Sequence, residues 1–136
     1  MKKERKILRA RSMQDKELLS LFLDNFSGVI DLGDAVSVLN TNGQYALDVR
    51  YADLVKNGFL DRFIRGLHIF GDTSLKISEC VGHEIAINVD RITEWHSQYG
   101  YTLITVGGFR EVPVCESDAE VSDRIFEKLD ELGCAQ

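Results

Sequence analysis

The chain lacks the features of a disulfide-stabilised or multidomain protein. Its 136 residues include three cysteines and a single proline. An odd number of cysteines in a chain without an export signal predicts reduced thiols rather than a disulfide framework. No Ser/Gly-rich or low-complexity stretch marks a linker between domains. We therefore expect a single folded domain over residues 12–136, preceded by a basic, flexible leader at residues 1–11.

Long apolar segments are also missing. No stretch approaches the roughly 18 consecutive apolar residues that a membrane-spanning helix needs. The N-terminal segment MKKERKILRARSMQ is basic, but it has neither the apolar core nor the cleavage site of a secretory signal. These absences predict a cytoplasmic protein that makes no membrane contact.

The sequence contains none of the common catalytic motifs. It has no P-loop, no nucleophile elbow, no glycine-rich dinucleotide fingerprint and no HExxH zinc motif. Asp31 and Asp34 in DLGD, and Glu79 with Glu84, are paired acids, but such pairs beside a glycine are typical of turns. We therefore predict a protein that is not an enzyme and carries no cofactor. A Cys/His pair built around Cys115 stays open, because spatial neighbours are invisible in a sequence.

One pattern is typical of a metal site. Cys80 and His83 in CVGH have a C-x2-H spacing that can chelate zinc, and His96 with Cys115 would complete a tetrahedral set. Zinc domains usually offer two closely spaced ligand pairs, whereas His96 and Cys115 are far apart in the sequence. The favoured interpretation is a turn histidine beside a buried thiol, with no bound metal.

Charge is distributed unevenly along the chain. Residues 1–11 carry six basic groups and one acidic group, a net charge of +5 that leaves −11 of the total −6 for the remaining residues. An acidic surface repels phosphates and attracts basic partners. We therefore predict a protein partner with a basic surface. The candidate binding residues are the carboxylates of the C-terminal segment: Glu116, Asp118, Glu120, Asp123, Glu127, Asp130 and Glu131.

Apolar spacing predicts three helices. The first covers residues 12–26, where leucine and phenylalanine recur at helical intervals. The second covers residues 51–65, with Asn57 and Gly58 as a break or kink. The third covers residues 117–132, where Ser117 and Glu120 have the spacing of a capping box.

Turn signals predict hairpins between these helices. Asn42–Gly43, residues 81–83 and Gly107–Gly108 are the expected turns. Pro113 cannot donate a ladder hydrogen bond, so its strand is expected at a sheet edge. The fold class is thus α+β, a mostly antiparallel sheet packed by about three helices; an edge-strand or helix-mediated dimer is left open. The expected registers pair Val38 with Leu47, Ile77 with Ile87, and Leu103 with Val112.

Part of the C-terminal half follows a known pattern. Residues 87–92 read INVDRI, and residues 114–121 read VCESDAEV. Together these motifs resemble those of small FlbD/SwrD-type flagellar-operon proteins, over residues 67–132. The resemblance implies an accessory module without catalytic residues that acts through protein contacts. The strand pattern is also similar to that of the DNA-binding LytTR fold, but the basic reading surface of that fold is missing from this sequence.

Two classes of binding function follow. A non-catalytic regulator or inhibitor that acts by protein–protein contact through its acidic surface fits the composition best. It would be a phage-type inhibitor of a bacterial defence or nucleic-acid-handling complex, or alternatively a toxin-immunity or flagellar-operon accessory protein. The alternative class is a nucleic-acid binder that uses the basic N-terminal arm, although the acidic body argues against nucleic acid as a partner.

Overall fold

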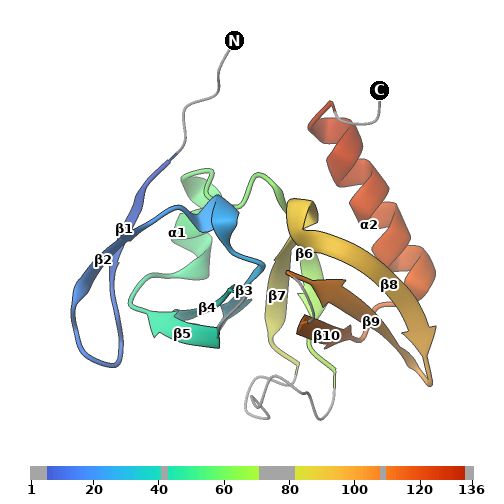
Figure 1. Cartoon of the computed structure of the whole chain (residues 1–136), viewed down its shortest axis with the longest axis horizontal. Helices are drawn as coiled ribbons and strands as arrows, with labels where there is room; N and C mark the ends of the chain where they lie inside the picture. The colour runs from blue at the N-terminus through green and yellow to red at the C-terminus, as the bar shows by residue number, and fades with distance from the viewer. Residues whose placement is uncertain (1–5, 41–42, 71–81, 108–109, 134–136) are drawn as a thin grey trace.

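The fold is mostly β. The structure is a computed structural model of the whole chain, and it describes residues 6–40, 43–70, 82–107 and 110–133. Within these ranges the chain forms ten strands in three antiparallel sheets (Figure 1). The same ranges hold two α-helices, and only one of them is longer than six residues. The prediction of a sheet packed by three helices is therefore wrong.

A five-stranded antiparallel sheet forms the centre of the molecule. Its strand order is β5-β4-β3-β7-β6. Val29 and Ile30 are neighbours on β3 that point to opposite faces of the sheet, and both are completely buried. Both faces of the sheet are therefore covered. The strands are β3 (Gly28–Asp31), β4 (Val36–Asn40), β5 (Gly43–Leu47), β6 (Phe63–His68) and β7 (Glu84–Asn88).

One face of the central sheet is covered by a hairpin and a short helix. The hairpin consists of β1 (Leu8–Arg11) and β2 (Leu18–Leu21), and a 3₁₀ turn, η1 (Leu23–Asn25), leads from it into β3. The helix α1 (Tyr51–Lys56) lies on the same face, and its Tyr51 and Leu54 belong to the same buried cluster as Leu8 and Ala10 of the hairpin. The hairpin-side cluster of buried residues comprises Leu8, Ala10, Leu23, Phe26, Val29, Val36, Val38, Leu47, Tyr51, Leu54, Leu60, Phe63 and Ala86.

The other face is covered by a second sheet and the long helix. The strands β8 (Ile92–Gln98), β9 (Tyr101–Val106) and β10 (Arg110–Val114) form a three-stranded sheet. The helix α2 (Asp118–Glu131) contacts β6, β8, β9 and the 3₁₀ turn η3 (Val89–Arg91). The helix-side cluster comprises Ile30, Leu39, Ile64, Leu67, Ile69, Ile85, Ile87, Val89, Ile104, Val106, Val112, Val114, Val121 and Ile125.

Backbone bonds join the central and the three-stranded sheets. Ile69, just after β6, forms an isolated antiparallel bridge with Val114 of β10. Beside this bridge, the Phe70 N–H donates to the Pro113 carbonyl at 3.0 Å, and the Cys115 N–H donates to the His68 carbonyl at 2.8 Å. β6 therefore pairs with β7 along its length and meets β10 at its end.

The predicted N-terminal helix over residues 12–26 is absent. This segment forms a turn, then β2 and η1. In β2 the side chains alternate between exposed and half-buried, so Leu19 and Leu21 face the sheet. Lys16 has a φ of 64°, a left-handed conformation that no helix contains. Residues 8–11 of the predicted leader form β1, with Leu8 and Ala10 buried.

The predicted central helix is too long. α1 ends at Lys56, and Gly58, with a φ of +76°, lies just beyond it. A left-handed glycine after the last helical turn is a common helix stop. β6 begins at Phe63, inside the predicted helical range.

The predicted hairpins are right in place but not in register. Val38 pairs with Tyr45 rather than with Leu47, a shift of two positions that keeps the same face inward. Val112 pairs with Ile104 rather than with Leu103, a shift of one position that turns the other face inward. β10 does lie at an edge of its own sheet, as Pro113 predicted.

The prediction for residues 75–89 is wrong where the structure tests it. Ile77 lies outside the described residues, and Ile87 pairs with Gly28 on one side and with Ile64 on the other. The segment from Ile92 onward forms the seven-residue strand β8.

The C-terminal helix is confirmed. Ser117 caps it, with its Oγ accepting from the Glu120 N–H at 3.2 Å, and the reciprocal half of the capping box is also present. Val121 and Ile125 are buried against the sheets. Gly133, with a φ of +70°, follows the last turn. Neither α2 nor the other described helix is long and apolar enough to cross a membrane.

Candidate functional site

Glu116, one of the seven predicted acidic surface residues, is held inside the structure. Its carboxylate accepts a hydrogen bond from the His68 backbone N–H at 2.9 Å and lies 2.8 Å from Nδ1 of the same histidine. Its side chain is only 11% exposed. Glu116 therefore fastens the start of α2 to the end of β6 and is not an open contact residue.

The six other predicted residues lie on α2, but in different settings. Glu120 completes the capping box, and Asp118 accepts from the Ser122 hydroxyl at 3.2 Å. Glu131 forms an ion pair with Lys128 at 3.6 Å. The remaining carboxylates lie on the exposed side of the helix: Asp123, Glu127 and Asp130.

The described histidines of the candidate zinc set contact other groups. Cys80 lies outside the described residues. His83 Nδ1 is 2.7 Å from the Asp31 carbonyl oxygen, and His96 Nε2 is 2.6 Å from the Gln98 amide nitrogen. No group of three or more histidine, cysteine, aspartate or glutamate side chains that could hold a metal occurs among the described residues.

Asp31 and Glu84 accept hydrogen bonds within the fold, and the thiol of Cys115 is not activated. Asp31 Oδ1 accepts from the Gly33 N–H at 2.9 Å, which confirms a turn at DLGD, and Glu79 lies outside the described residues. Glu84 accepts from the Tyr51 hydroxyl at 2.7 Å. Burial and the nearby Glu116 carboxylate raise the pKa of the Cys115 thiol. A raised pKa disfavours the nucleophilic thiolate.

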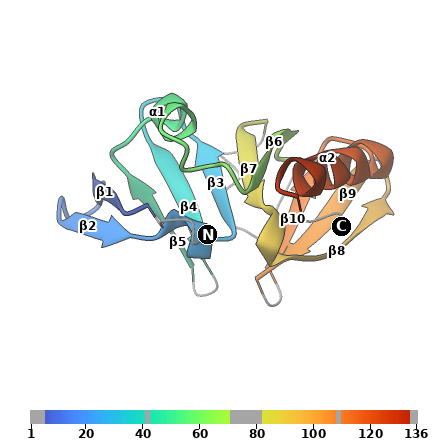
Figure 2. The same cartoon turned by 90° about the horizontal axis from the view of Figure 1, so that it is seen from above.

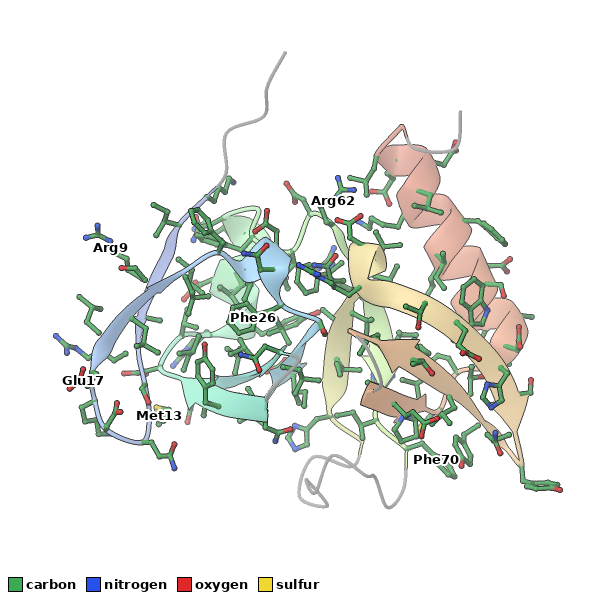
Figure 3. All side chains as sticks on the ribbon, in the orientation of Figure 1. Arg9, Met13, Glu17, Phe26, Arg62 and Phe70 are labelled. Carbon is green, nitrogen blue, oxygen red and sulfur yellow. The ribbon has the colours of Figure 1, made fainter. Side chains whose placement is uncertain are left out.

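The β1–β2 hairpin presents a basic outer face. Along β1 the side chains alternate, so that Leu8 and Ala10 pack inward while Arg9 and Arg11 are exposed. Figure 3 shows Arg9 pointing away from the body of the molecule. Exposed apolar side chains accompany these arginines on or beside the hairpin: Ile7, Met13 and Leu18.

Backbone hydrogen bonds hold this face in place. The Met13 N–H donates to the Ala46 carbonyl at 3.0 Å, and the Asp48 N–H donates to the Arg11 carbonyl at 2.8 Å. The hairpin is thereby attached to the β5 edge of the central sheet. Within the hairpin turn, Arg11 Nη1 donates to the Lys16 carbonyl at 3.0 Å. The two arginines thus project from a fixed backbone.

Opposite charges gather at opposite ends of the molecule. Residues 6–21 contain four basic and two acidic side chains, and residues 1–5 add three basic and one acidic. The helix α2 contains six acidic and two basic side chains. In both Figure 1 and Figure 2 the hairpin and α2 lie at opposite ends.

The basic face was not among the predicted sites, because residues 1–11 were interpreted as a flexible leader. The signal was present in LRAR, where apolar and basic residues alternate with the period of a strand.

Comparison with known proteins gives one structural likeness. No family model matches the chain, and no curated protein matches it significantly. The fold is similar to that of the LytTr DNA-binding domain of a putative methyl-accepting/DNA response regulator from Bacillus cereus, with a TM-score of 0.58. The alignment covers 90% of this chain and 98% of that one, at 10% sequence identity. At this identity the likeness shows the fold, a LytTR-like arrangement of strands.

Proposed function

We propose that this protein is a nucleic-acid-binding module that contacts the phosphate backbone with the basic face of the β1–β2 hairpin. The observation that carries the proposal is the outward projection of Arg9 and Arg11 from a hairpin fixed to the central sheet. Arginine donates paired, charge-assisted hydrogen bonds to phosphate oxygens. The three additional basic residues within 1–5 add charge to the segment that leads into this face.

The LytTR-like fold corrects the function predicted from composition. A protein-binding inhibitor with an acidic surface was preferred, and nucleic acid was considered a poor partner. The similar solved structure is a DNA-binding domain, which favours the alternative, a nucleic-acid binder that uses its basic N-terminal arm. The prediction gave more weight to the charge of −11 on residues 12–136 than to the +5 on residues 1–11, because the basic segment was expected to be a flexible leader.

The acidic helix constrains how nucleic acid would dock. Carboxylates repel phosphates within about one Debye length, ~8 Å at physiological salt. Because α2 lies at the far end from the hairpin, a duplex on the hairpin face avoids this repulsion. Beside the arginines, Ile7 and Leu18 are 53% and 56% exposed. These side chains offer apolar contact area for sugars and base edges.

The test is a salt titration of DNA binding by the full chain. A fluorescently labelled duplex is titrated with the wild type and with a double variant, Arg9→Gln with Arg11→Gln, at several salt concentrations. Each lost phosphate contact should reduce the slope of log K against log salt by about 0.9. We expect the double variant to bind about tenfold more weakly or worse, with a slope lower by nearly two.

The matched control removes the same charge elsewhere. Lys56 on α1 and Arg91 on η3 are both exposed, so the double variant Lys56→Gln with Arg91→Gln has the same net charge as the hairpin variant. It should retain the wild-type slope. If both variants lose affinity equally, binding follows net charge alone and the hairpin is not the interface.

A further inference from the structure

A second cationic site lies where α2 meets β6, at the end of the molecule opposite the hairpin. A pocket of about 190 Å³ opens there between the strand and the helix. Three of its lining residues are cationic: Arg65 from β6, and Arg124 and Lys128 from successive turns of α2. The other lining residues are Phe63, Ile64, Glu127 and Glu131.

The pocket depends on an irregularity in β6. The strand register shifts between Ile64 and Leu67, and Gly66 has a φ of +78° within this bulge. The Arg65 carbonyl there accepts a hydrogen bond from Arg124 Nη1 at 3.1 Å. A Cβ on Gly66 would come within 2.9 Å of the same Nη1. A glycine at this position therefore lets the guanidinium lie directly over the strand.

One donor of Arg124 has no partner. Its Nε is buried and makes no hydrogen bond to any of the described residues. Buried polar atoms are almost always hydrogen-bonded, and an unpaired donor on a charged group is especially unfavourable. Nη1 is already used by the Arg65 carbonyl. Nε and Nη2 share the edge of the guanidinium that binds an oxyanion side-on, so binding there requires the side chain to turn its covered Nε toward the pocket.

Lys128 adds a second cation at this point. Its side chain is only 15% exposed, whereas its ion-pair partner Glu131 is 66% exposed. The Lys128 side chain is therefore mostly covered, whereas the carboxylate that pairs with its ammonium group is exposed. Among the charged lining residues, three cations stand against two carboxylates. The pocket thus has a net positive charge in the middle of an acidic helix surface.

We propose that this pocket binds a small phosphate, as inorganic phosphate or a phosphate monoester, with Arg124, Arg65 and Lys128 as its ligands. Drug-sized ligands occupy pockets of about 300–1,000 Å³, so a pocket of about 190 Å³ suits a small ion. The site is separate from the proposed nucleic-acid interface and does not depend on it.

Inorganic phosphate is the probe. Phosphate is titrated into the ¹⁵N-labelled full chain at constant ionic strength, with chloride as the balancing anion, and amide shifts are followed by NMR. We expect saturable shifts confined to residues 63–66 and 124–131. Phosphate should also raise the melting temperature, because a ligand that binds only the folded state stabilises it.

Arg65→Gln is the most informative variant. It removes one cation but keeps the backbone carbonyl that Arg124 uses, so the attachment of α2 to β6 persists. It should weaken phosphate binding about tenfold. Arg124→Gln should abolish the binding, with its folding checked by circular dichroism. Arg91→Gln, which removes an exposed cation outside the pocket, should bind like the wild type.

Three results would overturn the assignment. The first is the absence of saturable shifts at the pocket. The second is equal phosphate affinity in the wild type and Arg65→Gln, which would leave Arg124 with a purely structural role. The third is equally tight binding of acetate, which would exclude phosphate as the preferred class. The hairpin variant Arg9→Gln with Arg11→Gln should retain phosphate binding, so each proposal can fail without the other.

Discussion

The two faces of the central sheet are covered by different kinds of side chain. Under α2 and the three-stranded sheet, the buried cluster consists entirely of isoleucine, valine and leucine. Under the hairpin, the cluster contains three buried aromatic residues, Phe26, Tyr51 and Phe63. The helix that covers the aliphatic face has 14 residues, and the one beside the hairpin has six. Large aromatic side chains fill the hairpin face, where a long helix is absent.

The α2 end and the hairpin end of the molecule differ in charge, and they also differ in the contacts that stabilise them. α2 is organised locally, by a capping box and an apolar stripe within one segment. The hairpin is organised by distant partners, since Met13 and Asp48 tie it to β5. An end of the molecule that depends on distant contacts is also the one that carries the proposed nucleic-acid interface.

Truncating one residue on each face gives the largest expected effect. Phe63 and Ile64 are sequence neighbours on β6, are 0% and 2% exposed, and belong to opposite clusters. Phe63→Ala should lower the free energy of unfolding by about 3–5 kcal/mol and Ile64→Ala by about 2–5 kcal/mol. Urea denaturation followed by circular dichroism measures both. A loss below ~1 kcal/mol for either variant would mean that its face of the sheet is not packed.

Removing one serine at each end should have a smaller effect. Ser117→Ala deletes the N-cap of α2 and should cost about 1 kcal/mol. Ser12 is 6% exposed in the hairpin turn, and its Oγ accepts from the Gln14 N–H at 3.3 Å. Ser12→Ala should cost about 0.5–1.5 kcal/mol, as expected for one neutral hydrogen bond. Thermal unfolding compares the two variants. Ser20→Ala, which changes an exposed serine on β2, is the control and should leave the melting temperature nearly unchanged.

Neutralising the exposed carboxylates of α2 tests how far the charge separation matters. Asp123→Asn with Glu127→Gln and Asp130→Asn removes three negative charges at the end away from the hairpin. DNA affinity should rise by only about two- to threefold at low salt and not at all at 0.15 M, where screening is strong. A rise above tenfold in a binding titration would place the nucleic acid near α2 instead.

The smallest effect is expected from acid titration of one ion pair. Arg62 Nε and Nη2 donate to the two carboxylate oxygens of Asp90, and these bonds lower the pKa of Asp90 below its ordinary value of 3.8. A lowered pKa in the folded state means that the stabilisation is present above pH 3.8 and disappears as the pH falls through the folded-state pKa. The contribution should stay below ~1 kcal/mol, since the Asp90 side chain is 42% exposed.

Replacing the aspartate isolates this contribution. Asp90→Asn should melt slightly below the wild type at neutral pH, and the difference should shrink as the pH falls below 3.8. Melting curves between pH 2 and pH 7 provide the measurement. A difference that stays constant over that range would show that the ion pair does not account for it.

The C-terminal helix could be predicted because its information is local. Ser117, Glu120 and the apolar residues that follow lie within one short segment, and Gly133 marks the end. The position of the β4–β5 hairpin could be predicted for the same reason, but its register could not, since Gly43, expected in the turn, pairs with Asn40.

The remaining elements depend on partners far away in the sequence. β7 pairs with β3, from which three other strands separate it in the chain, and with β6, which precedes it across the 15 residues 69–83. Strands buried on both faces show no alternation, so their apolar runs read equally well as helix. That ambiguity explains the overlong helix over residues 51–65, which ran into β6. The false helix over residues 12–26 has another cause: β2 reads LLSL, with leucine on its exposed side as well as on its half-buried side, so the sequence shows no alternation. The resemblance to FlbD/SwrD-type proteins is tested by none of the comparisons and stays a prediction.

The candidate sites also divide into one that is encoded locally and one that depends on residues far apart in the sequence. The basic alternation in β1 was readable in LRAR, but the flexible-leader interpretation hid it. The cationic pocket was not readable, because Arg65 and Arg124 are 59 positions apart and meet only through the β6 bulge. Sequence reasoning placed Glu127 and Glu131 on an acidic helix surface and assigned no site to the cations beside them.

The bonds between the end of β6 and β10 have a consequence for how the molecule opens. Ile69 pairs with Val114, Phe70 donates to Pro113, and Cys115 donates to His68. The central sheet and the three-stranded sheet therefore cannot separate unless these backbone hydrogen bonds break first. Slow amide exchange at Ile69, Phe70 and Cys115 should accordingly match that of the central strands, as one cooperative unit. Two backbone hydrogen bonds hold the β1–β2 hairpin to β5. We therefore expect the hairpin to open locally more often, and its amides to exchange faster, than those of the central strands.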